Sequence, residues 1–470
     1  MDKTIAIYTL GCKVNQGESQ AMLDAFRQRG WQPVDFDQPA AVYIINTCTV
    51  TQAADQKSRK MIRGAKKSNP RALLVVTGCY AESGGGALAA IKEIDLVLGN
   101  RQKEEMPVLV EELWRQKAGQ PESDAGAVAG AAGAVAETAA ETAAGAAAEA
   151  GAMPHEEAVP PILLKGLDRT RATLKLQDGC RQFCSYCIIP YVRQEWQSLP
   201  AAKALERVGE MAEQGLREVV LLGIHLGAYG WETGKQDQLS IVLEQLLEAY
   251  PQVRFRLGSL EPMEATARLI SLIRDYPNAC KHLHLPLQSG TDSILKAMNR
   301  PYLTADFREK AAEIRQAIPD IALTTDVMVG FPGESEEDFR QCQAFVEEMA
   351  FSRLHVFAYS RRPGTPAAAM AGQVPKAEKE ERSRALIALG QKLQENYGAS
   401  WLGRRQWVLA EEEIGGGFWQ GHSDNYLEIT FQPPSTLPEG TAIKGSLLPV
   451  KIAGKSGRKP EAWQGEYDPS

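Results

Sequence analysis

The sequence predicts a mixed α/β protein in which two segments built on parallel strands precede a small C-terminal β-barrel. Three observations predict this fold class. Strand-like and helix-like segments alternate over residues 3–115, alternate again over residues 166–395, and give way to short strands without a long helix over residues 400–465. Alternation of strands and helices is typical of parallel sheets covered by helices. Short strands separated by Gly and Pro turns are typical of a small barrel.

The first segment carries apolar, β-branched runs that predict strands. Between these runs the sequence has helical character. The expected strands are Thr4–Leu10, Ala41–Asn46 and Ala72–Thr77, and the expected helices are Glu18–Arg29 and Thr51–Lys67. Because successive strands are separated by helices, we expect a parallel sheet here.

The second segment repeats the strand and helix unit six times, which predicts an open or closed parallel βα barrel. Helical stretches such as Pro200–Glu213 and Glu336–Met349 lie between the strands. The expected strands are Thr173–Gln177, Glu218–Leu222, Val253–Leu257, His282–Leu285, Leu323–Val327 and Leu354–Phe357.

Composition divides the chain into four segments. Residues 117–161 are mostly Ala, Gly and Glu and offer no large side chains to bury, which predicts a linker. In the last segment we expect strands at Trp407–Glu412, Tyr426–Phe431 and Ala442–Ile452. The predicted boundaries are a domain at 1–116, the linker at 117–161, the βα barrel at 162–398 and the β-barrel at 399–470.

Composition also limits the class of protein. Among the 470 residues, 44% are hydrophobic and 24% charged, as in ordinary globular chains. The net charge of −7 argues against a generally basic nucleic-acid coat, although a local basic groove remains open. No apolar run is long enough to span a membrane, and the start lacks the apolar core of a signal peptide, so we expect a cytoplasmic protein without a membrane partner. Eight cysteines in such a chain favour metal or redox chemistry over disulfides.

One cysteine motif directly follows a predicted strand. Cys180, Cys184 and Cys187 have the spacing Cys-x3-Cys-x2-Cys. Three thiolates in a tight loop can ligate three irons of a cubane cluster and leave the fourth iron open. A ferredoxin would need a nearby fourth cysteine, and a structural zinc site would need a fourth ligand that this loop lacks. The motif therefore predicts an iron–sulfur cluster with an open iron.

A second set of cysteines comes from the first segment. Cys12, Cys48 and Cys79 each follow one of its three predicted strands. Ligand sites in parallel sheets lie outside the carboxyl ends of the strands, so these thiols are expected to meet at one edge and share a cluster. The alternative is three separately buried thiols. Cys280 and Cys342 have no partner at metal-ligand spacing and are expected to be buried structural residues.

The Cys180 motif resembles that of the radical S-adenosylmethionine superfamily. The resemblance implies that the open iron chelates the methionine moiety of S-adenosylmethionine. An electron from the cluster then cleaves the sulfonium and gives a 5′-deoxyadenosyl radical. It also implies that Tyr186, the aromatic residue before the third cysteine, packs near the adenine.

Taken together, the motifs resemble those of the methylthiotransferase family over nearly the whole chain except 117–161. The resemblance implies a three-cysteine N-terminal domain, a radical S-adenosylmethionine partial (β/α)6 barrel, a C-terminal β-barrel of the RNA-binding TRAM type, and two [4Fe-4S] clusters. The segments that carry it are Gly11–Gln16, Asn46–Val50, Thr77–Cys79, Cys184–Tyr191, Leu285–Gly290 and Val329–Glu334.

The first of these segments also points to a branch of the family. Gly-Cys-Lys-Val-Asn-Gln, residues 11–16, resembles the branch that acts on N6-threonylcarbamoyladenosine beside the anticodon of tRNA. This implies replacement of the C2 hydrogen of that nucleoside by a methylthio group. One S-adenosylmethionine would supply the radical, another the methyl group, and the N-terminal cluster the sulfur. The alternatives are another modified adenosine, a ribosomal protein, or an RNA-binding protein with purely structural clusters.

Further residues fall where the superfamily contacts its cofactor. They end successive barrel strands, and helix capping or packing is the alternative role for each. The candidates are Gly223, Ser259, Glu261, Gln288 and Ser289. Single histidines beside apolar strands, such as His225, His282 and His284, are expected to be hydrogen-bonded core residues. The sequence identifies no catalytic acid or base.

The segment after Tyr191 departs from the family pattern. A Gly/Arg-rich stretch ending in Arg-Ser-Arg is usual there, whereas this chain has Val192-Arg193-Gln194-Glu195-Trp196-Gln197-Ser198. Gly17 also stands where the branch commonly has an aromatic residue.

The expected partners follow from the same resemblance. They are tRNA and an electron donor such as flavodoxin or ferredoxin, while the sulfur donor stays unidentified. Basic side chains and aromatic rings of the last segment suit RNA, although core packing of the rings is the alternative. They are Lys451, Lys455, Arg458 and Lys459, with Trp401, Trp407, Trp419 and Tyr426.

Overall fold

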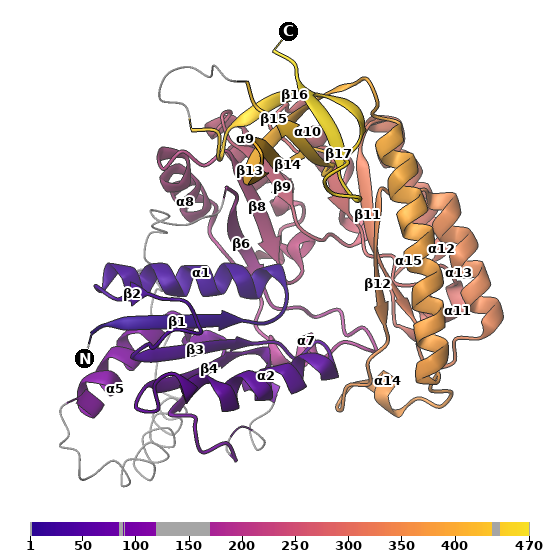
Figure 1. The fold of residues 1–470 in the computed structure, drawn as a ribbon. Helices are drawn as coiled ribbons and strands as arrows, with labels where there is room; N and C mark the ends of the chain where they lie inside the picture. Colours follow the sequence, from indigo (N-terminus) through magenta and orange to yellow (C-terminus); the bar gives the residue numbers. More distant parts are fainter. Residues whose placement is uncertain (1, 84–87, 89, 119–169, 435–441, 470) are drawn as a thin grey trace. The chain divides into compact units, whose positions relative to one another are not determined.

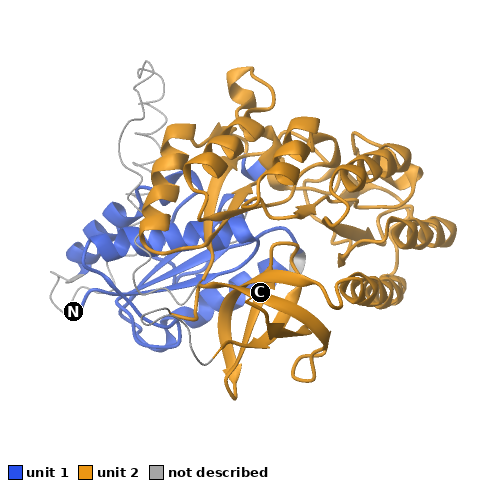
Figure 2. Cartoon of the chain, turned by 90° about the horizontal axis from the view of Figure 1, so that it is seen from above, with its two compact units in different colours: residues 1–163, 191–193 blue, residues 164–190, 194–470 orange. Residues whose placement is uncertain are grey.

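The computed structural model describes residues 2–83, 88, 90–118, 170–434 and 442–469. The predicted linker at 117–161 lies outside these residues except for its first two positions. The chain forms two compact units (Figure 2). Unit 1 consists of residues 1–163 and 191–193, and unit 2 of residues 164–190 and 194–470. Three residues that follow the second cysteine motif in the chain thus belong to unit 1.

Unit 1 is built on a five-stranded parallel sheet in the order β2-β1-β3-β4-β5 (Figure 1). Its strands are β1 Thr4–Thr9, β2 Gln32–Pro33, β3 Val42–Thr47, β4 Leu73–Gly78 and β5 Leu96–Val97. Its helices are α1 Lys13–Gln28, α2 Gln52–Gly64, α3 Cys79–Ser83 and α5 Met106–Ala118, with short 3-10 turns η1 Ala65–Lys67 and η2 Arg101–Lys103.

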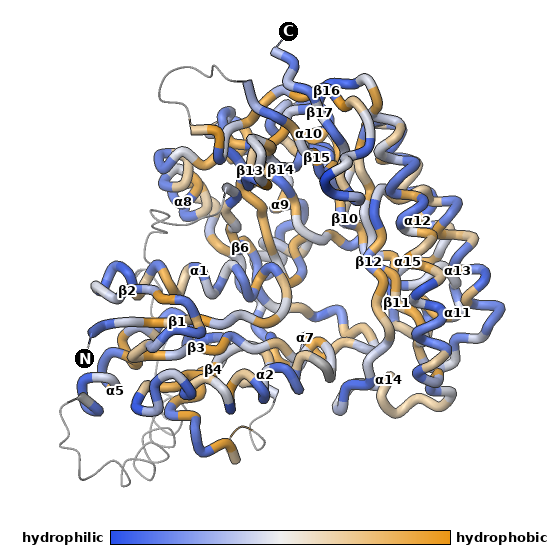
Figure 3. The backbone as a smooth tube through the Cα atoms, viewed as in Figure 1, coloured by the Kyte–Doolittle hydropathy of each residue, from blue (hydrophilic) through white to orange (hydrophobic). Residues whose placement is uncertain are grey.

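Helices cover both faces of this sheet. On one face Ile5 packs with Phe26 of α1 and Val110 of α5. On the other face Tyr43 packs with Ile62 of α2. Strands β3 and β4 are buried on both faces. Their sequences are therefore largely apolar and do not alternate between apolar and polar residues, and Figure 3 shows β4 as largely hydrophobic. The predicted parallel sheet is confirmed.

Unit 2 begins with the open barrel. Strands β6, β8 and β9 pair in parallel, β10, β11 and β12 pair in parallel, and isolated parallel bridges such as Ser259 to His284 join the two groups. The short strand β7 pairs antiparallel with β6. The bounds are β6 Ala172–Asp178, β7 Gln197–Ser198, β8 Glu218–Gly223, β9 Arg254–Leu257, β10 His282–His284, β11 Ala322–Val329 and β12 Arg353–Ala358.

Helices connect these strands, as the sequence predicts. Several begin at side-chain caps: the hydroxyl of Ser335 accepts a hydrogen bond from the amide of Asp338 at 3.0 Å at the start of α13. The helices are α7 Ile189–Val192, α8 Ala201–Glu213, α9 Gln238–Ala249, α10 Ala267–Asp275, α11 Asp292–Ala297, α12 Thr304–Ala317, α13 Glu336–Met349, α14 Pro366–Ala369 and α15 Lys376–Ala399. The 3-10 turns are η4 Leu226–Ala228, η5 Trp231–Thr233 and η6 Pro262–Glu264.

The end of unit 2 is a closed barrel in the order β13-β14-β15-β17-β16. Its core contains Val408, Ile429, Phe431, Val450 and Trp463. The strands are β13 Arg405–Gly415, β14 Phe418–Ser423, β15 Glu428–Gln432, β16 Leu447–Lys455 and β17 Trp463–Tyr467. The predicted β-barrel is confirmed, and the sequence prediction missed β14 and β17.

Buried charges join this small barrel to the parallel strands. Glu218 and Arg254 are the first residues of β8 and β9. Glu218 is fully buried and pairs with Arg254 and with Arg256, whose Nε lies 3.0 Å from its Oε1. The arginines also donate to backbone carbonyls of Trp407 at 3.0 Å and of Ser423 at 3.0 Å. The small barrel therefore docks at the amino ends of the parallel strands and leaves their carboxyl ends for a site.

A search of the described residues finds no helix that is long and apolar enough to cross a membrane.

Candidate functional site

Unit 1 brings the three cysteines of its strand ends together. Cys12 follows β1, Cys48 follows β3, and Cys79 follows β4 directly. The register aligns these ends, because Asn46 of β3 pairs with Thr9 of β1 and with Thr77 of β4. Cys48 and Cys79 are 5% and 4% exposed. Cys12 is exposed as a whole residue, although its thiol is largely removed from solvent.

The thiols are close enough to affect one another. Burial, together with the charges of Cys79 and Cys12, raises the pKa of Cys48 to about 11. Burial of the thiol likewise raises the pKa of Cys12, and Cys79 contributes in the same direction. Thiolates so placed need a positive counter-charge, which a bound metal supplies. The three neighbouring thiols fit a cubane with one iron left without a protein ligand.

Two glycines make room for this arrangement. Gly11 has φ +109°, and a Cβ there would lie 2.8 Å from Cβ and 3.0 Å from Sγ of Cys48. Gly78 has φ +97°, and a Cβ there would lie 2.3 Å from the carbonyl oxygen of Thr47. Both conformations are ones that residues with a side chain rarely adopt. The Gly-Cys pairs thus follow from the approach of neighbouring strand ends.

Asparagine side chains lock the cysteine loops together. The Nδ2 of Asn15 donates to the carbonyls of Leu10 at 2.8 Å and Thr47 at 3.0 Å. The Nδ2 of Asn46 donates to the carbonyl of Asn15 at 2.9 Å. These fully buried amides satisfy backbone groups of two loops and fix the positions of Cys12 and Cys48.

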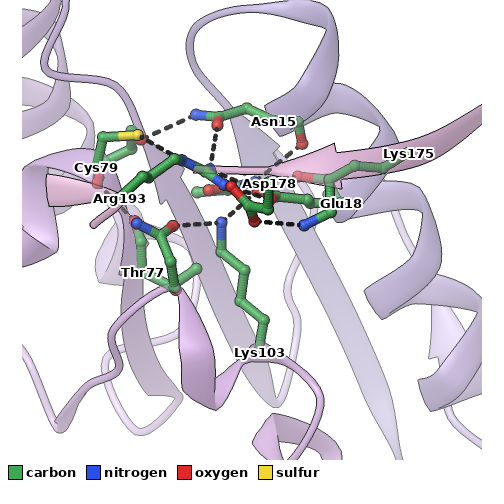
Figure 4. A network of polar contacts seen from close by, with 12 residues as sticks. Asn15, Glu18, Thr77, Cys79, Lys103, Lys175, Asp178 and Arg193 are labelled. Atoms are coloured by element: carbon green, nitrogen blue, oxygen red, sulfur yellow. Dashed lines mark hydrogen bonds and ion pairs between the residues drawn. The ribbon is translucent and has the colours of Figure 1, made fainter. Parts of the chain in front are cut away.

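A buried charged group lies beside Cys79 (Figure 4). It consists of Glu18, Lys103 and Arg193, which we call the Glu18 group. The Nε of Arg193 lies 3.4 Å from Sγ of Cys79, and Lys103 Nζ lies 2.5 Å from Glu18. Burial lowers the pKa of Lys103, while Glu18 acts in the opposite direction. From the sequence, Arg193 stands out only within a departure from the family pattern, and neither Glu18 nor Lys103 was predicted as a site residue.

The second cysteine loop follows β6 in unit 2. Its backbone is strained: Phe183, a residue with a side chain, has φ +47°. Two hydrogen bonds hold the loop from outside. The backbone amide of Ser185 donates to the carbonyl of Met298 at 3.0 Å, and the side-chain Nδ2 of Asn299 donates to the carbonyl of Phe183 at 3.1 Å. These bonds therefore hold the loop that carries the three thiols in one conformation.

Charged partners lie beside two of these thiols. The Nη1 of Arg300 donates to Sγ of Cys184 at 3.3 Å, and Arg300 also pairs with Glu261. His225 Nδ1 lies 3.9 Å from Sγ of Cys180, and its Nε2 lies 2.5 Å from Glu264. Although burial alone lowers the pKa of His225, the bonds to Cys180 and Glu264 raise it to about 10. His225 is thus a hydrogen-bonded residue of the site.

Burial and neighbouring thiols also change the pKa values of the cysteines in this loop. Burial, together with the charges of Cys184 and Cys180, raises the pKa of Cys187 to about 12. Burial raises the pKa of Cys184, which Arg300 opposes. Among the residues that the structure describes, no three His, Cys, Asp or Glu side chains could hold a single metal ion. A cubane cluster does not require three side chains around one ion, because each thiolate binds a different iron.

The structure also places the other cofactor candidates. Gly223 ends β8, exposed Ser259 follows β9, and Glu261 precedes η6, where its amide donates to Glu264 at 3.2 Å. Tyr186 packs partly buried against the cluster of Ile294 and Phe331. All of these residues lie at the carboxyl ends of the barrel strands or in the cysteine loop.

Gln288 and Ser289 differ from each other. Gln288 has φ +65° and is held by backbone bonds to Asp326 at 2.9 Å and Met328 at 2.8 Å. Strain of this kind often marks functional sites. Ser289 is 2% exposed, and its hydroxyl lies 3.3 Å from that of Thr291, so packing accounts for it.

The remaining candidates are spread over the molecule. Cys280 and Cys342 are buried, as predicted. Trp401 lies in the core of the small barrel, whereas Trp407 is 53% exposed with Arg405 over its ring at 5.5 Å. Tyr426 stacks on His282 with 4.9 Å between ring centroids. The aromatic residues of the last segment therefore divide between core packing and the surface.

Comparison with known proteins identifies the family. Residues 4–99 match the model described as the uncharacterized protein family UPF0004, and residues 174–346 match the radical SAM superfamily. The threonylcarbamoyladenosine tRNA methylthiotransferase MtaB of Bacillus subtilis is 36% identical over 454 residues, which cover 96% of this chain and 93% of that protein. This chain belongs to the radical S-adenosylmethionine methylthiotransferase family.

Other relatives span the branches of the methylthiotransferase family. The MtaB of Aquifex aeolicus is 35% identical over 90% of this chain and 96% of its own length. The ribosomal protein uS12 methylthiotransferase RimO of Roseiflexus sp. is 34% identical over 95% of this chain and 94% of its own length. The prediction of a radical S-adenosylmethionine enzyme with [4Fe-4S] clusters and S-adenosylmethionine as cofactors is confirmed at the level of this family.

A solved structure supports the fold of this methylthiotransferase. The radical S-adenosylmethionine methyltransferase TsrM of Kitasatospora setae, with cobalamin and a [4Fe-4S] cluster bound, superposes with a TM-score of 0.54. It covers 78% of this chain and 77% of its own length at 13% identity. At that identity the likeness concerns the fold alone.

Proposed function

We propose that this chain is a tRNA methylthiotransferase that replaces the C2 hydrogen of N6-threonylcarbamoyladenosine, next to the anticodon, by a methylthio group. The observation that carries the proposal is its likeness to MtaB proteins over nearly the whole length, at 36% and 35% identity for two of them. The Gly11–Gln16 segment supports the same branch. A tRNA substrate also implies a cytoplasmic location.

The proposal assigns the ligands of two clusters. Cys180, Cys184 and Cys187 hold the cluster of the barrel. The strand-end cysteines Cys12, Cys48 and Cys79 hold the cluster of unit 1. When bound, the barrel cluster and S-adenosylmethionine supply the 5′-deoxyadenosyl radical, and the other cluster supplies sulfur. An electron donor such as flavodoxin or ferredoxin completes the reaction.

The protein's own residues hold the barrel loop and its charges in place. Arg300 donates to the sulfur of Cys184, and His225 lies within reach of the sulfur of Cys180. Hydrogen bonds from outside a metal site orient its ligands and stabilise their charge. Because Glu261 and Glu264 hold these two cations in turn, they act as supports of the loop.

Contacts to S-adenosylmethionine are proposed for the candidates at the strand ends. They are Tyr186, Gly223, Ser259 and Gln288. Exposure of Ser259 and the strained backbone of Gln288 support a contact. For Glu261 and Ser289 the protein partners described above support a structural role instead.

The remaining assignments concern the segments of the chain. We propose the N-terminal cluster domain at 1–116, the linker at 117–161, the radical S-adenosylmethionine barrel at 162–398 and a TRAM-like RNA-binding barrel at 399–470. The exposed ring of Trp407 with Arg405 supports stacking on RNA.

A second candidate is a different substrate for the same chemistry. A tRNA-2-methylthio-N(6)-dimethylallyladenosine synthase is 32% identical over 97% of this chain, and the RimO relative is 34% identical. These values are close to those of the MtaB proteins. The family alone therefore leaves another modified adenosine or a ribosomal protein as alternatives.

Mass spectrometry of nucleosides from a strain that lacks the gene decides between these substrates. We expect loss of methylthiolated threonylcarbamoyladenosine, restored by the wild-type chain but not by Cys184→Ala. If only the dimethylallyl nucleoside or only the modified ribosomal protein lost its methylthio group, the proposed substrate would be wrong.

A further inference from the structure

The Glu18 group lies deep inside unit 1. The side chains of Arg193, Glu18 and Lys103 are 2%, 7% and 7% exposed. Burying charged side chains is costly unless they are paired and hydrogen-bonded. Arg193 meets that condition, since its Nη1 and Nη2 lie 2.9 and 3.1 Å from the two carboxylate oxygens of Glu18.

The same contacts orient the guanidinium toward one cysteine. Glu18 holds the two terminal nitrogens, and Nη2 also lies 3.3 Å from Oδ1 of Asn15. The remaining nitrogen, Nε, then lies 3.4 Å from Sγ of Cys79 (Figure 4). Asn15 is the residue that locks the loops of Cys12 and Cys48. One arginine thus connects the third cysteine to the side chain that fixes the other two.

We propose that Arg193 is a positioning residue of the unit 1 cluster, which donates an N–H···S hydrogen bond to Cys79 and sets the reduction potential of that cluster. The proposal rests on ligation by Cys12, Cys48 and Cys79. A hydrogen bond and a positive charge at a cluster sulfur stabilise the reduced cluster, because reduction adds negative charge. Lys103 adds a second cation through Glu18.

The position of Arg193 in the chain gives this contact a further consequence. Arg193 follows Cys187 closely in sequence, yet residues 191–193 belong to unit 1. The loop that leaves the barrel motif thus supplies a side chain to the cysteines of unit 1.

The test uses the full chain with Cys180, Cys184 and Cys187 replaced by Ala, so that only the unit 1 cluster remains. In this parent we compare Arg193→Gln, Arg193→Lys and the matched control Arg29→Gln. Arg29 pairs with Glu111 in the same unit and is 43% exposed. Each protein is reconstituted anaerobically, its iron is measured, and its cluster is titrated by electron paramagnetic resonance.

We expect Arg193→Gln to shift the reduction potential to more negative values and to alter the resonance of the reduced cluster. Arg193→Lys keeps the positive charge but loses the planar guanidinium, so its reduction potential should lie between those of Arg193→Gln and the parent. Arg29→Gln should match the parent. Circular dichroism verifies that each variant folds. If Arg193→Gln does not fold, the reduction potential and resonance of Arg193→Lys test the inference instead.

Three results would overturn the inference. Parent-like potential and resonance in the Arg193 variants would show that Arg193 does not act on the cluster, as would an equal shift in Arg29→Gln. A parent chain that holds no iron would instead refute the ligation by Cys12, Cys48 and Cys79, and the inference with it. The iron content of the parent therefore separates the two failures.

Discussion

The guanidinium of Arg300 lies 3.3 Å from Sγ of Cys184, and its side chain is 2% exposed. It resembles Arg193 beside Cys79, because each arginine also pairs with a glutamate, Glu261 for Arg300 and the buried Glu18 for Arg193. Two unrelated parts of the chain thus place an arginine held by a carboxylate against a cysteine sulfur. In both places a positive charge lies within hydrogen-bond distance of a cysteine sulfur.

Arg300→Gln is predicted to impair the barrel site. The variant loses the hydrogen bond from Arg300 to Sγ of Cys184, and Glu261 loses the guanidinium with which it pairs. Changes of this kind around a metal typically cost about 10–100-fold in activity. We expect such a fall in 5′-deoxyadenosine formation, measured by chromatography. Arg274→Gln, at an exposed arginine of the same unit, is the control, and equal rates in both variants would contradict the role of Arg300.

The two clusters are predicted to have separate tasks. The triple variant Cys12→Ala, Cys48→Ala, Cys79→Ala keeps the barrel cysteines, so it should still cleave S-adenosylmethionine to 5′-deoxyadenosine. It should form no methylthio product on tRNA, because the sulfur source is lost. Cys184→Ala should do neither. Both products are measured side by side, and methylthiolated adenosine from the triple variant would disprove the function of the unit 1 cysteines.

Asp24 is predicted to destabilise unit 1 at neutral pH. Burial raises its pKa to about 6, although Gln20 and Arg27 act against this. A carboxyl whose pKa is higher in the folded state stabilises the fold below its unfolded pKa and loses that contribution as pH rises through the folded value. Asp24→Asn should therefore gain on the order of 1–2 kcal/mol relative to wild type above pH 6.

The measurement is urea unfolding at acidic and neutral pH. The advantage of Asp24→Asn should shrink as pH falls from about 6 toward 4, because wild-type Asp24 is then protonated in the fold. Asp35→Asn, at an exposed aspartate of the same unit, should show no such change. If the free energies of unfolding of Asp24→Asn and wild type differed by the same amount across this pH range, the charge of buried Asp24 would not be the cause of the difference.

Local patterns predicted most of the fold. The strands β3, β4 and β8 are apolar runs, and burial on both faces makes such runs visible in sequence. Strand β14 was missed because Phe418–Ser423 mixes polar residues with glycine. Its pairing depends on Gly421, where a Cβ would lie 1.9 Å from the carbonyl oxygen of Leu409. That contact exists only after the barrel closes.

The cysteines could be predicted because both sets lie just after the ends of strands. Their partners could not. Arg193 and Glu18 are separated by 175 positions, and Lys103 and Glu18 by 85. Hydrophobic periodicity carries no information about such pairs, since it reports only which face of an element is buried. Three-dimensional packing alone brings these charges to Cys79.

Glu218→Gln is predicted to destabilise unit 2 strongly. Burial alone would raise the pKa of Glu218, but Arg254 and Arg256 hold it below its ordinary value. The variant leaves two buried guanidinium groups without their carboxylate, a loss that typically costs about 3–5 kcal/mol. It also weakens the docking of the small barrel, because the same arginines donate to backbone carbonyls of Trp407 and Ser423.

Urea unfolding and limited proteolysis together check this prediction. We expect a lower unfolding midpoint for Glu218→Gln at pH 7 and earlier cleavage within residues 405–467. Since the folded pKa of Glu218 is depressed, its contribution is present above the unfolded pKa and declines on acidification, so the deficit should narrow at low pH. Glu244→Gln breaks an exposed pair with Arg268 and should cost at most about 1 kcal/mol. Equal deficits in the two variants would mean that burial of Glu218 adds nothing to the docking of the small barrel.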